Sequence, residues 1–326
     1  MPARVRGKLS LSTLLVVAAL AAPTVAAAGN GGFAPLAPHS PNAHNITDTY
    51  YVILVFTGII FVIVEAALVA FIVKYRNRGR PRDADGAQVH GATRLELIWT
   101  VIPVIILAII GTFVFVKLPD ITGPPAEAAA PQRVTVDAHQ FYWQFIYPNG
   151  ARSIDVLHLP VDRVTNIDII TQDVNHSWWI PELGGKTDAI AGKVNHTWYR
   201  PDEVGGYVGQ CAELCGVFHE KMRATAVVED AQSYDAFTRT GWRQVLGKSE
   251  WEGVCAKCHG PGGAGDYGPA INANPLLTQP AGLTQLLRNG FGRMPAVGNN
   301  WTREQVQALI RYVKSNIYKG AATSGG

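Results

Sequence analysis

Cysteine, histidine and methionine are concentrated in one short stretch of the sequence, residues 209–222. It holds Cys211, Cys215, His219 and Met222. These side chains are the ligands that soft and borderline metals prefer, copper above all. A mononuclear blue-copper site needs one Cys, so the second Cys suggests two copper ions bridged by thiolates. The alternative is a tetrahedral zinc site completed by a distant His, which would leave Met222 without a role.

The second cluster, Cys255-Ala256-Lys257-Cys258-His259, has the C-x-x-C-H spacing of covalent haem c attachment. The two thiols would form thioethers to the haem, and His259 would be one axial ligand. Met294 is the only downstream Met, and a Met/His pair is the usual ligation of electron-transfer cytochromes. A bare C-x-x-C could instead be a redox disulfide or half of a zinc site. The adjacent His and the glycine-rich loop after it favour haem.

The pattern Cys-x-Glu-Leu-Cys-Gly-x-x-His-x-x-Met resembles the binuclear copper loop, CuA, of cytochrome c oxidase subunit II. Residues 173–181 resemble the segment of that family that carries the other imidazole ligand, and the resemblance covers about residues 48–228. It implies these copper ligands: His176, Cys211, Cys215, His219, Met222 and the backbone carbonyl of Glu213. It also implies that the Glu213 side chain faces a magnesium ion shared with the catalytic subunit. Asp188 is either a turn carboxylate or, by the resemblance, a residue that helps to hold that ion or its waters.

The first 120 residues predict export of the chain and its insertion into a membrane. Residues 1–28 have the basic start, short apolar run and small-residue end of a signal peptide. The alternative is an uncleaved extra helix. Residues 29–50 are expected to form an irregular leader. Apolar runs at 51–73 and 97–116 are long enough to span a bilayer and define a helical hairpin at 51–120.

Basic residues fill the loop between the two spans, which marks its cytoplasmic side. Both metal-binding clusters then lie on the outer, periplasmic or extracellular, face of a bacterial cell membrane. Of the 326 residues, 48% are hydrophobic and only 16% are charged, which fits a multidomain membrane protein. The net charge of +3 is too small to indicate a nucleic-acid partner.

Alternation with a period of two at residues 133–138, 166–170 and 223–228 predicts β-strands. With a metal loop between the last two strands, a cupredoxin-like β-sandwich over residues 131–229 fits best. A polar linker comes next. Residues 242–320 have helical periodicity, including a capping box that starts at Thr302, and predict an all-α class I cytochrome c domain.

Other residues have two interpretations. Glu96 is either an acid at a helix N-terminus or, by the resemblance, the entrance of a proton channel into the catalytic subunit. Phe141, Tyr142 and Trp143 are either sheet core or, by the resemblance, the patch that receives electrons beside the copper. That family usually has Trp in place of Phe141, so docking of a free cytochrome c here is in question.

These features resemble subunit II of a haem–copper cytochrome c oxidase with a fused cytochrome c domain. The resemblance implies electron flow from an external donor to haem c, then CuA, then subunit I, where oxygen is reduced to water with proton translocation. Subunit I and subunit III are the expected partners, and magnesium is expected at the interface with subunit I. The alternatives are subunit II of a CuA-containing nitric oxide reductase and a membrane-tethered electron carrier outside any enzyme.

Overall fold

The computed structural model describes residues 34–76, 86, 88, 90–125 and 131–320. The expected signal peptide, residues 1–28, lies outside them. The described residues from Ala37 onward belong to one compact unit. It contains a helical hairpin, a β-sandwich and a helical C-terminal domain.

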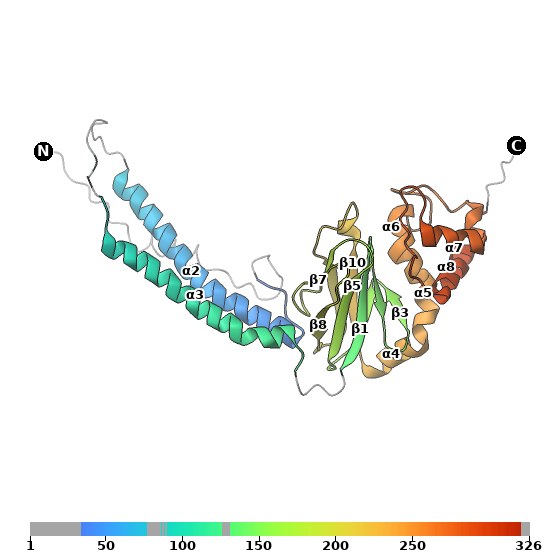
Figure 1. The fold of residues 1–326 in the computed structure, drawn as a ribbon, viewed down its shortest axis with the longest axis horizontal. Helices are drawn as coiled ribbons and strands as arrows, with labels where there is room; N and C mark the ends of the chain where they lie inside the picture. Colours follow the sequence, from blue (N-terminus) through green and yellow to red (C-terminus); the bar gives the residue numbers. More distant parts are fainter. Residues whose placement is uncertain (1–33, 77–85, 87, 89, 126–130, 321–326) are drawn as a thin grey trace, which may run out of the picture. The chain divides into compact units, whose positions relative to one another are not determined.

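The hairpin consists of α2 (Pro41–Tyr75) and α3 (Thr93–Thr122), which pack side by side (Figure 1). Both helices are long and apolar enough to cross a membrane, as the sequence predicts. The prediction of an irregular leader up to residue 50 is wrong for its last part, because α2 already begins at Pro41. Proline suits the first helical turn, where its missing N–H is not needed. Asn42, one residue later, anchors this end by donating to the carbonyl of Trp198 (2.7 Å).

Apolar side chains cover the outside of the hairpin. Val55, Ile63, Leu107 and Phe115 are among the many exposed ones, and the exposed fraction of Phe115 reaches 78%. Two helices alone cannot cover this surface, so lipid or a partner subunit must do so.

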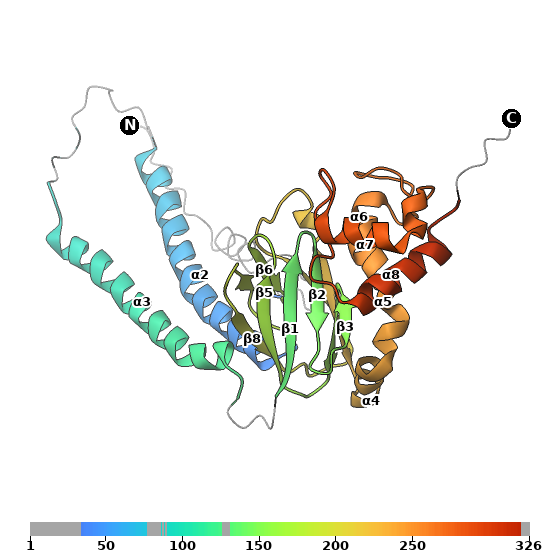
Figure 2. The same ribbon diagram turned by 45° about the vertical axis from the view of Figure 1, so that its right-hand side comes forward.

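The sandwich consists of two five-stranded sheets, with strand orders β3-β2-β1-β5-β8 and β4-β10-β9-β6-β7. In the first sheet, β3, β2 and β1 are successive neighbours (Figure 2). The strands of the first sheet are β1 (Gln132–His139), β2 (Tyr142–Ile146), β3 (Arg152–Ile154), β5 (Thr165–Thr171) and β8 (Asn195–Tyr199). Those of the second are β4 (Val156–Pro160), β6 (His176–Trp179), β7 (Thr187–Ala189), β9 (Gly205–Cys211) and β10 (Arg223–Glu229). The three predicted strands are β1, β5 and β10.

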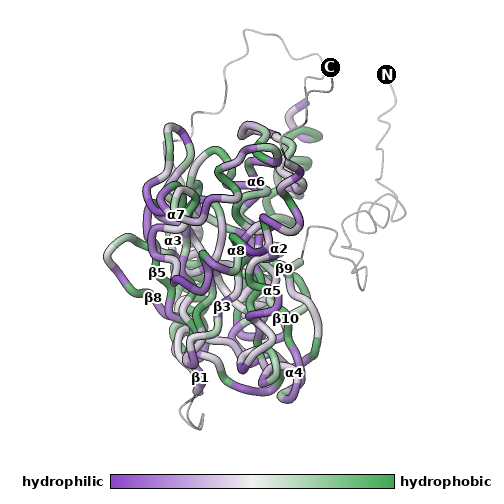
Figure 3. Tube along the Cα trace, turned by 90° about the vertical axis from the view of Figure 1, so that its right-hand side faces the viewer, coloured by the Kyte–Doolittle hydropathy of each residue, from purple (hydrophilic) through white to green (hydrophobic). Residues whose placement is uncertain are grey.

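Alternating hydropathy explains why these segments form a sandwich. Along β5 and β10 every second side chain is buried, from Thr165 to Ile169 and from Ala224 to Val228. Hydrophobic and hydrophilic residues are interspersed along the chain (Figure 3). Successive strand residues point to opposite faces, so each sheet presents one apolar face to the other. Parallel pairing of β1 with β5 aligns Val136 with Ile169, and both side chains are fully buried in the core.

The C-terminal domain is helical. Its elements are α5 (Trp242–Glu250), the π-helical turn η3 (Trp251–Cys255), α6 (Ala256–His259), η4 (Pro275–Thr278), α7 (Pro280–Asn289) and α8 (Arg303–Asn316). The predicted capping box is present, since Thr302 and Gln305 bond reciprocally at the start of α8. Helices α5 and α8 cross so closely that a Cβ at Gly247 would collide with the carbonyl oxygen of Ala308. The sequence prediction of a helical domain is confirmed.

The segment between the sandwich and the C-terminal domain is itself helical. Strand β10 ends at Glu229, and Asp230 caps α4 (Ala231–Ala236) by accepting from the backbone N–H groups of Gln232 and Ser233. The π-helical turn η2 (Phe237–Gly241) joins α4 to α5. Helical backbone therefore continues from Ala231 to His259, where Gly260, with a φ of 76°, ends it.

The sandwich and the C-terminal domain share a core. Tyr142 of β2 and Ile154 of β3 are buried together with Trp251, Trp301 and Leu309 of the C-terminal domain. Tyr142 Oη donates to the carbonyl of Val297 (2.6 Å) and accepts from Trp301 Nε1 (3.0 Å). Fully buried aromatic groups with satisfied polar ends are typical of permanent interfaces.

Polar side chains extend this shared interface. Gln305 Nε2 donates to Gln144 Oε1 (2.8 Å), and Asn300 Nδ2 donates to Asp137 Oδ2 (2.8 Å). Glu250 is fully buried in the C-terminal domain, and neither of its carboxyl oxygens has a hydrogen-bond partner among the described residues. Burial raises the pKa of Glu250 to about 9. The carboxyl is therefore neutral at pH 7, and a neutral carboxyl costs less to bury than a carboxylate.

Candidate copper and haem sites

Three elements of the second sheet bring the predicted copper ligands to one end of the sandwich. Cys211 is the last residue of β9, His176 is the first of β6, and Met222 immediately precedes β10. Antiparallel pairing of β6 with β9 sets Trp178 opposite Cys211. This register places His176 beside the loop after Cys211.

The donor atoms converge around the two thiols. The Sγ atoms of Cys211 and Cys215 lie 3.9 Å apart. His176 Nδ1 lies 3.8 Å from the Cys211 sulfur, and His219 Nδ1 lies 3.6 Å from the Cys215 sulfur. Met222 Sδ lies 3.8 Å from the Cys215 sulfur, and the carbonyl oxygen of Glu213 is 3.2 Å from the Cys211 sulfur. All the ligands implied by the resemblance are thus brought together.

The charge state of the thiols favours a bound cation. The hydrogen bond between the two thiols lowers the pKa of Cys211 to about 3. The same bond raises the pKa of Cys215 well above its usual range. Metal ligation needs thiolates, and a bound cation lowers the pKa of the thiols that ligate it. A dithiolate flanked by imidazoles and a buried thioether fits copper better than a hard cation.

Asp173 contacts a predicted copper ligand and was not assigned from the sequence. Its Oδ1 lies 2.8 Å from Nε2 of His176, and its Oδ2 accepts from the backbone N–H of Gln140 (2.7 Å). Burial opposes ionisation, but the bonds from His176 and the backbone prevail and lower the pKa of Asp173. A carboxylate in this position orients a ligating imidazole, here with Nδ1 toward the thiols. Its position three residues before the predicted ligand His176 is the sequence feature that could have identified it.

The aromatic residues predicted as either core or electron patch lie beside the copper loop. Phe141 is half-buried and packs edge-to-face on Phe218 with ring centroids 5.5 Å apart. Tyr142 and Trp143 are fully buried. Trp143 contacts the ring of His176 at 6.0 Å between centroids. Two of the three are therefore core residues, and they connect the copper site to the rest of the molecule.

A cavity of about 700 Å³ lies at the haem attachment motif. Its lining includes Cys255, Cys258, His259 and Met294, the four residues predicted to hold haem c. His259 Nδ1 lies 2.8 Å from the carbonyl oxygen of Pro269, which leaves Nε2 for an iron ligand. The volume lies within the range of cofactor pockets, and the donor set fits a covalently attached haem.

The copper loop also lines this cavity, through Val217 and Phe218. Phe218 directly precedes His219, and its ring packs edge-to-face on Tyr267 of the C-terminal domain at 4.7 Å between centroids. The cavity is therefore bounded by residues of both domains, and one wall adjoins a copper ligand.

The remaining predicted residues are exposed. Glu213 carries its carboxylate on the outside of the copper loop, and Asp188 lies in β7 of the same sheet. Glu96 lies in the first turn of α3, where its Oε1 accepts from the backbone N–H of Ala92 (3.2 Å). Glu96 thus caps its own helix, as one of its two interpretations predicts.

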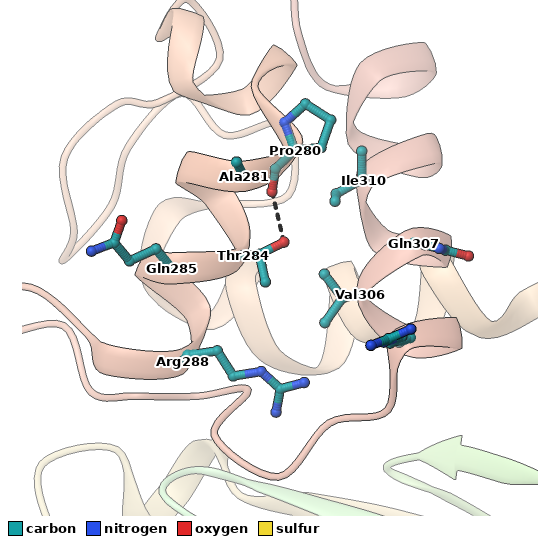
Figure 4. A pocket seen from close by; sticks show the side chains of 9 residues that line it. Pro280, Ala281, Thr284, Gln285, Arg288, Val306, Gln307 and Ile310 are labelled. Carbon is teal, nitrogen blue, oxygen red and sulfur yellow. Dashed lines mark hydrogen bonds between the residues drawn. The ribbon is translucent and has the colours of Figure 1, made fainter.

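A second hollow lies between α7 and α8 (Figure 4). Two of its polar side chains are bound locally: Thr284 Oγ1 donates to the carbonyl of Pro280 (2.6 Å), and Arg288 donates to the carbonyls of Gly298, Asn299 and Trp301. Its lining holds no thiol, imidazole or carboxylate. We assign it no chemical role.

Three family models match successive parts of the chain. Residues 32–116 match the transmembrane domain of cytochrome c oxidase subunit II, and residues 150–230 match its periplasmic domain. Residues 245–313 match subunit III of cbb3-type cytochrome c oxidase. The matches correspond to the hairpin, the sandwich and the C-terminal domain in order.

Curated relatives match most of the chain. Cytochrome c oxidase subunit 2 of Alkalihalophilus pseudofirmus is 31% identical, over 88% of this chain and 92% of that protein. Quinol oxidase subunit 2 of Bacillus spizizenii is 32% identical, over 64% of this chain and 65% of that protein. A crystal structure of the periplasmic domain of cytochrome oxidase subunit II from Bradyrhizobium japonicum is 26% identical, covers 36% of this chain and 96% of its own, and has a TM-score of 0.34.

The hairpin, the converging copper ligands and these matches agree. The chain is a membrane protein with its two folded domains on the outer face, and it belongs to the cytochrome c oxidase subunit II family, extended at its C-terminal end by a cytochrome c domain.

Proposed function

We propose that this chain is the electron-input subunit of a haem–copper terminal oxidase that reduces oxygen to water and translocates protons. Cys255 and Cys258 would attach haem c, and His259 and Met294 would ligate its iron. The copper ligands described above hold a binuclear CuA centre. When bound, the two groups supply one-electron redox chemistry, and electrons pass from an external donor through haem c and CuA to subunit I. Subunit III is a further expected partner.

The observation that carries this proposal is the shared wall of the haem cavity. Val217 and Phe218 line the cavity that the haem attachment motif also lines, and the next residue is the copper ligand His219. The copper loop and the haem attachment motif therefore face one cavity. Such proximity suits direct electron exchange, and a storage or transport role for the metals would not require it.

The residues also favour haem c as the site where electrons arrive. The family includes proteins named for cytochrome c and for quinol as donors, so family membership leaves the donor open. In this chain Tyr142 is buried against residues of the C-terminal domain, and Trp143 is buried in the core of the sandwich. A free donor has no access to them, so we propose that they lie on an internal route from haem c.

We propose a magnesium ion at the interface with subunit I, held through Glu213 and Asp188. The Glu213 backbone carbonyl faces the Cys211 sulfur (3.2 Å) while its side chain is exposed. One residue can therefore contact the copper site and a separate ion. Carboxylates are suitable magnesium ligands when a partner completes the octahedral shell.

The metal content tests the proposed function. We expect two copper ions per haem c in the full-length chain produced without the other oxidase subunits and purified in detergent. Metal analysis gives copper and zinc, and the pyridine haemochrome spectrum gives covalent haem. One copper per haem, or zinc in place of copper, would contradict the binuclear assignment.

Glu96→Gln tests the proposal that Glu96 feeds protons to subunit I. We expect slower oxygen turnover by the assembled oxidase, while copper and haem c are reduced at normal rates. Gln retains the oxygen that accepts from the Ala92 N–H but cannot titrate, so the variant separates proton uptake from helix capping. Unchanged turnover would leave Glu96 with the capping role alone.

A further inference from the structure

Lys257 connects the haem attachment motif to the copper domain. It is the second variable residue of the C-x-x-C-H motif, next to Cys258. Its Nζ lies 2.5 Å from Oδ2 of Asp155 and donates to the carbonyl of Phe141 at 2.9 Å. The side chains of Lys257 and Asp155 are only 15% and 18% exposed. This is a largely desolvated ion pair between two domains.

Asp155 is held rigidly for this contact. It links β3 to β4 with a φ of 57°, in the left-handed region that non-glycine residues rarely adopt. Its Oδ1 accepts from the backbone N–H of Trp143 (2.8 Å), and its own backbone N–H donates to the carbonyl of Trp143 (2.8 Å). Burial raises the pKa of Asp155, and Lys257 opposes that rise. These hydrogen bonds with Trp143 of β2 fix the position of the Asp155 carboxylate independently of Lys257.

Two further features bring the motif close to the copper domain. A side chain at Gly253 would collide with Ile154, so glycine there permits the approach of η3. On the other side of the motif, Lys221 donates to the carbonyl of Lys257 (3.4 Å) and lies 3.5 Å from Asp266. Lys221 directly precedes the copper ligand Met222. The motif is therefore contacted from β2–β4 and from the copper loop.

We propose that Lys257 and Asp155 are positioning residues that hold the haem attachment motif against the copper loop, so that the two redox centres keep one fixed separation. The inference rests on the proposed function, in which these centres exchange electrons. A buried ion pair is screened little by salt, whereas removing one partner leaves an uncompensated charge. The domains then stay docked through every electron transfer, with no docking step.

Lys257→Met tests this in the full-length chain carrying both cofactors. We expect unchanged copper and haem content but amide hydrogen exchange about tenfold faster in residues 140–156 and 251–260, the size typical of a lost coupled contact. Haem-to-copper electron transfer after a light flash should slow by about tenfold. Lys248→Met is the matched control, because Lys248 is an exposed lysine of the same domain, and its ion pair with Glu252 (3.9 Å) lies at the surface.

Asp155→Asn is the second test variant, because it removes the charge of Asp155 and leaves the residues of the haem motif unchanged. We expect it to reproduce the Lys257→Met exchange pattern, and the double variant to be no worse than either single one. Exchange at wild-type rates in either single variant, or equal effects from Lys248→Met, would overturn the inference. If the wild-type chain transfers no electron between the cofactors, the proposed function fails, while hydrogen exchange still decides the role of the ion pair.

Discussion

Cys215→Ser is expected to destroy the binuclear copper centre and leave haem c intact. The Cys215 sulfur lies within 4 Å of the Cys211 sulfur, His219 Nδ1 and Met222 Sδ, so one substitution removes the atom that joins the ligand set. Losing a residue that only supports a metal ligand already lowers metal affinity about 10–100-fold, and losing this thiolate should lower it further. Near-infrared copper absorption should disappear while the haem spectrum persists.

The matched control is Cys255→Ser/Cys258→Ser, which should show the reverse pattern. Copper and its near-infrared band remain, and covalent haem is lost. If Cys215→Ser retained two copper ions, the bridging assignment would be wrong. If it also lost haem, the change would report general unfolding of the shared core.

Electron transfer from haem c to copper is expected to be intramolecular. Even a flexible tether would hold the donor at an effective concentration of order mM, about 10³-fold above a micromolar free cytochrome, and here the two domains also share a core. The rate should not depend on protein concentration. It should barely change with ionic strength, because screening over ~10 Å at 0.1 M affects exposed charges and the contact that joins the domains is largely buried.

Flash or stopped-flow reduction of the full-length chain, followed at haem and copper separately, measures this rate. Reduction of haem c by its external donor is free to depend on salt. A copper reduction rate that rises with protein concentration would show transfer between molecules. A rate that persists in Cys255→Ser/Cys258→Ser would show that haem c is not the obligatory donor.

The sequence was most informative where chemistry depends on residue type and spacing. The Cys and Met residues of both clusters could be assigned because few other roles suit them, and the strands around residues 134, 167 and 226 were predictable from alternation. His176 was placed through the resemblance, and β6–β9 pairing now provides the physical reason. The early start of α2 was missed because Asn42 is held by a distant strand.

The contacts between domains could not be predicted from local patterns. Lys257 is a variable position of the haem motif, and Asp155 lies between strands β3 and β4. Their bond joins residues 102 positions apart and depends on a shared core that contains Tyr142 and Trp301. Asp173 was visible in the segment that carries His176, but its role emerges only from the direction of the imidazole.

The continuous helix from Ala231 to His259 gives the chain a property that a flexible tether lacks. A coil absorbs an added or deleted residue at little cost. In a helix, each added residue advances the axis by about 1.5 Å and turns the downstream part of the chain by about 100°. Insertion or deletion between Asp230 and Cys255 would therefore rotate the haem motif away from the copper loop. The number of residues in this segment is as much a requirement of the redox pair as the ligands themselves.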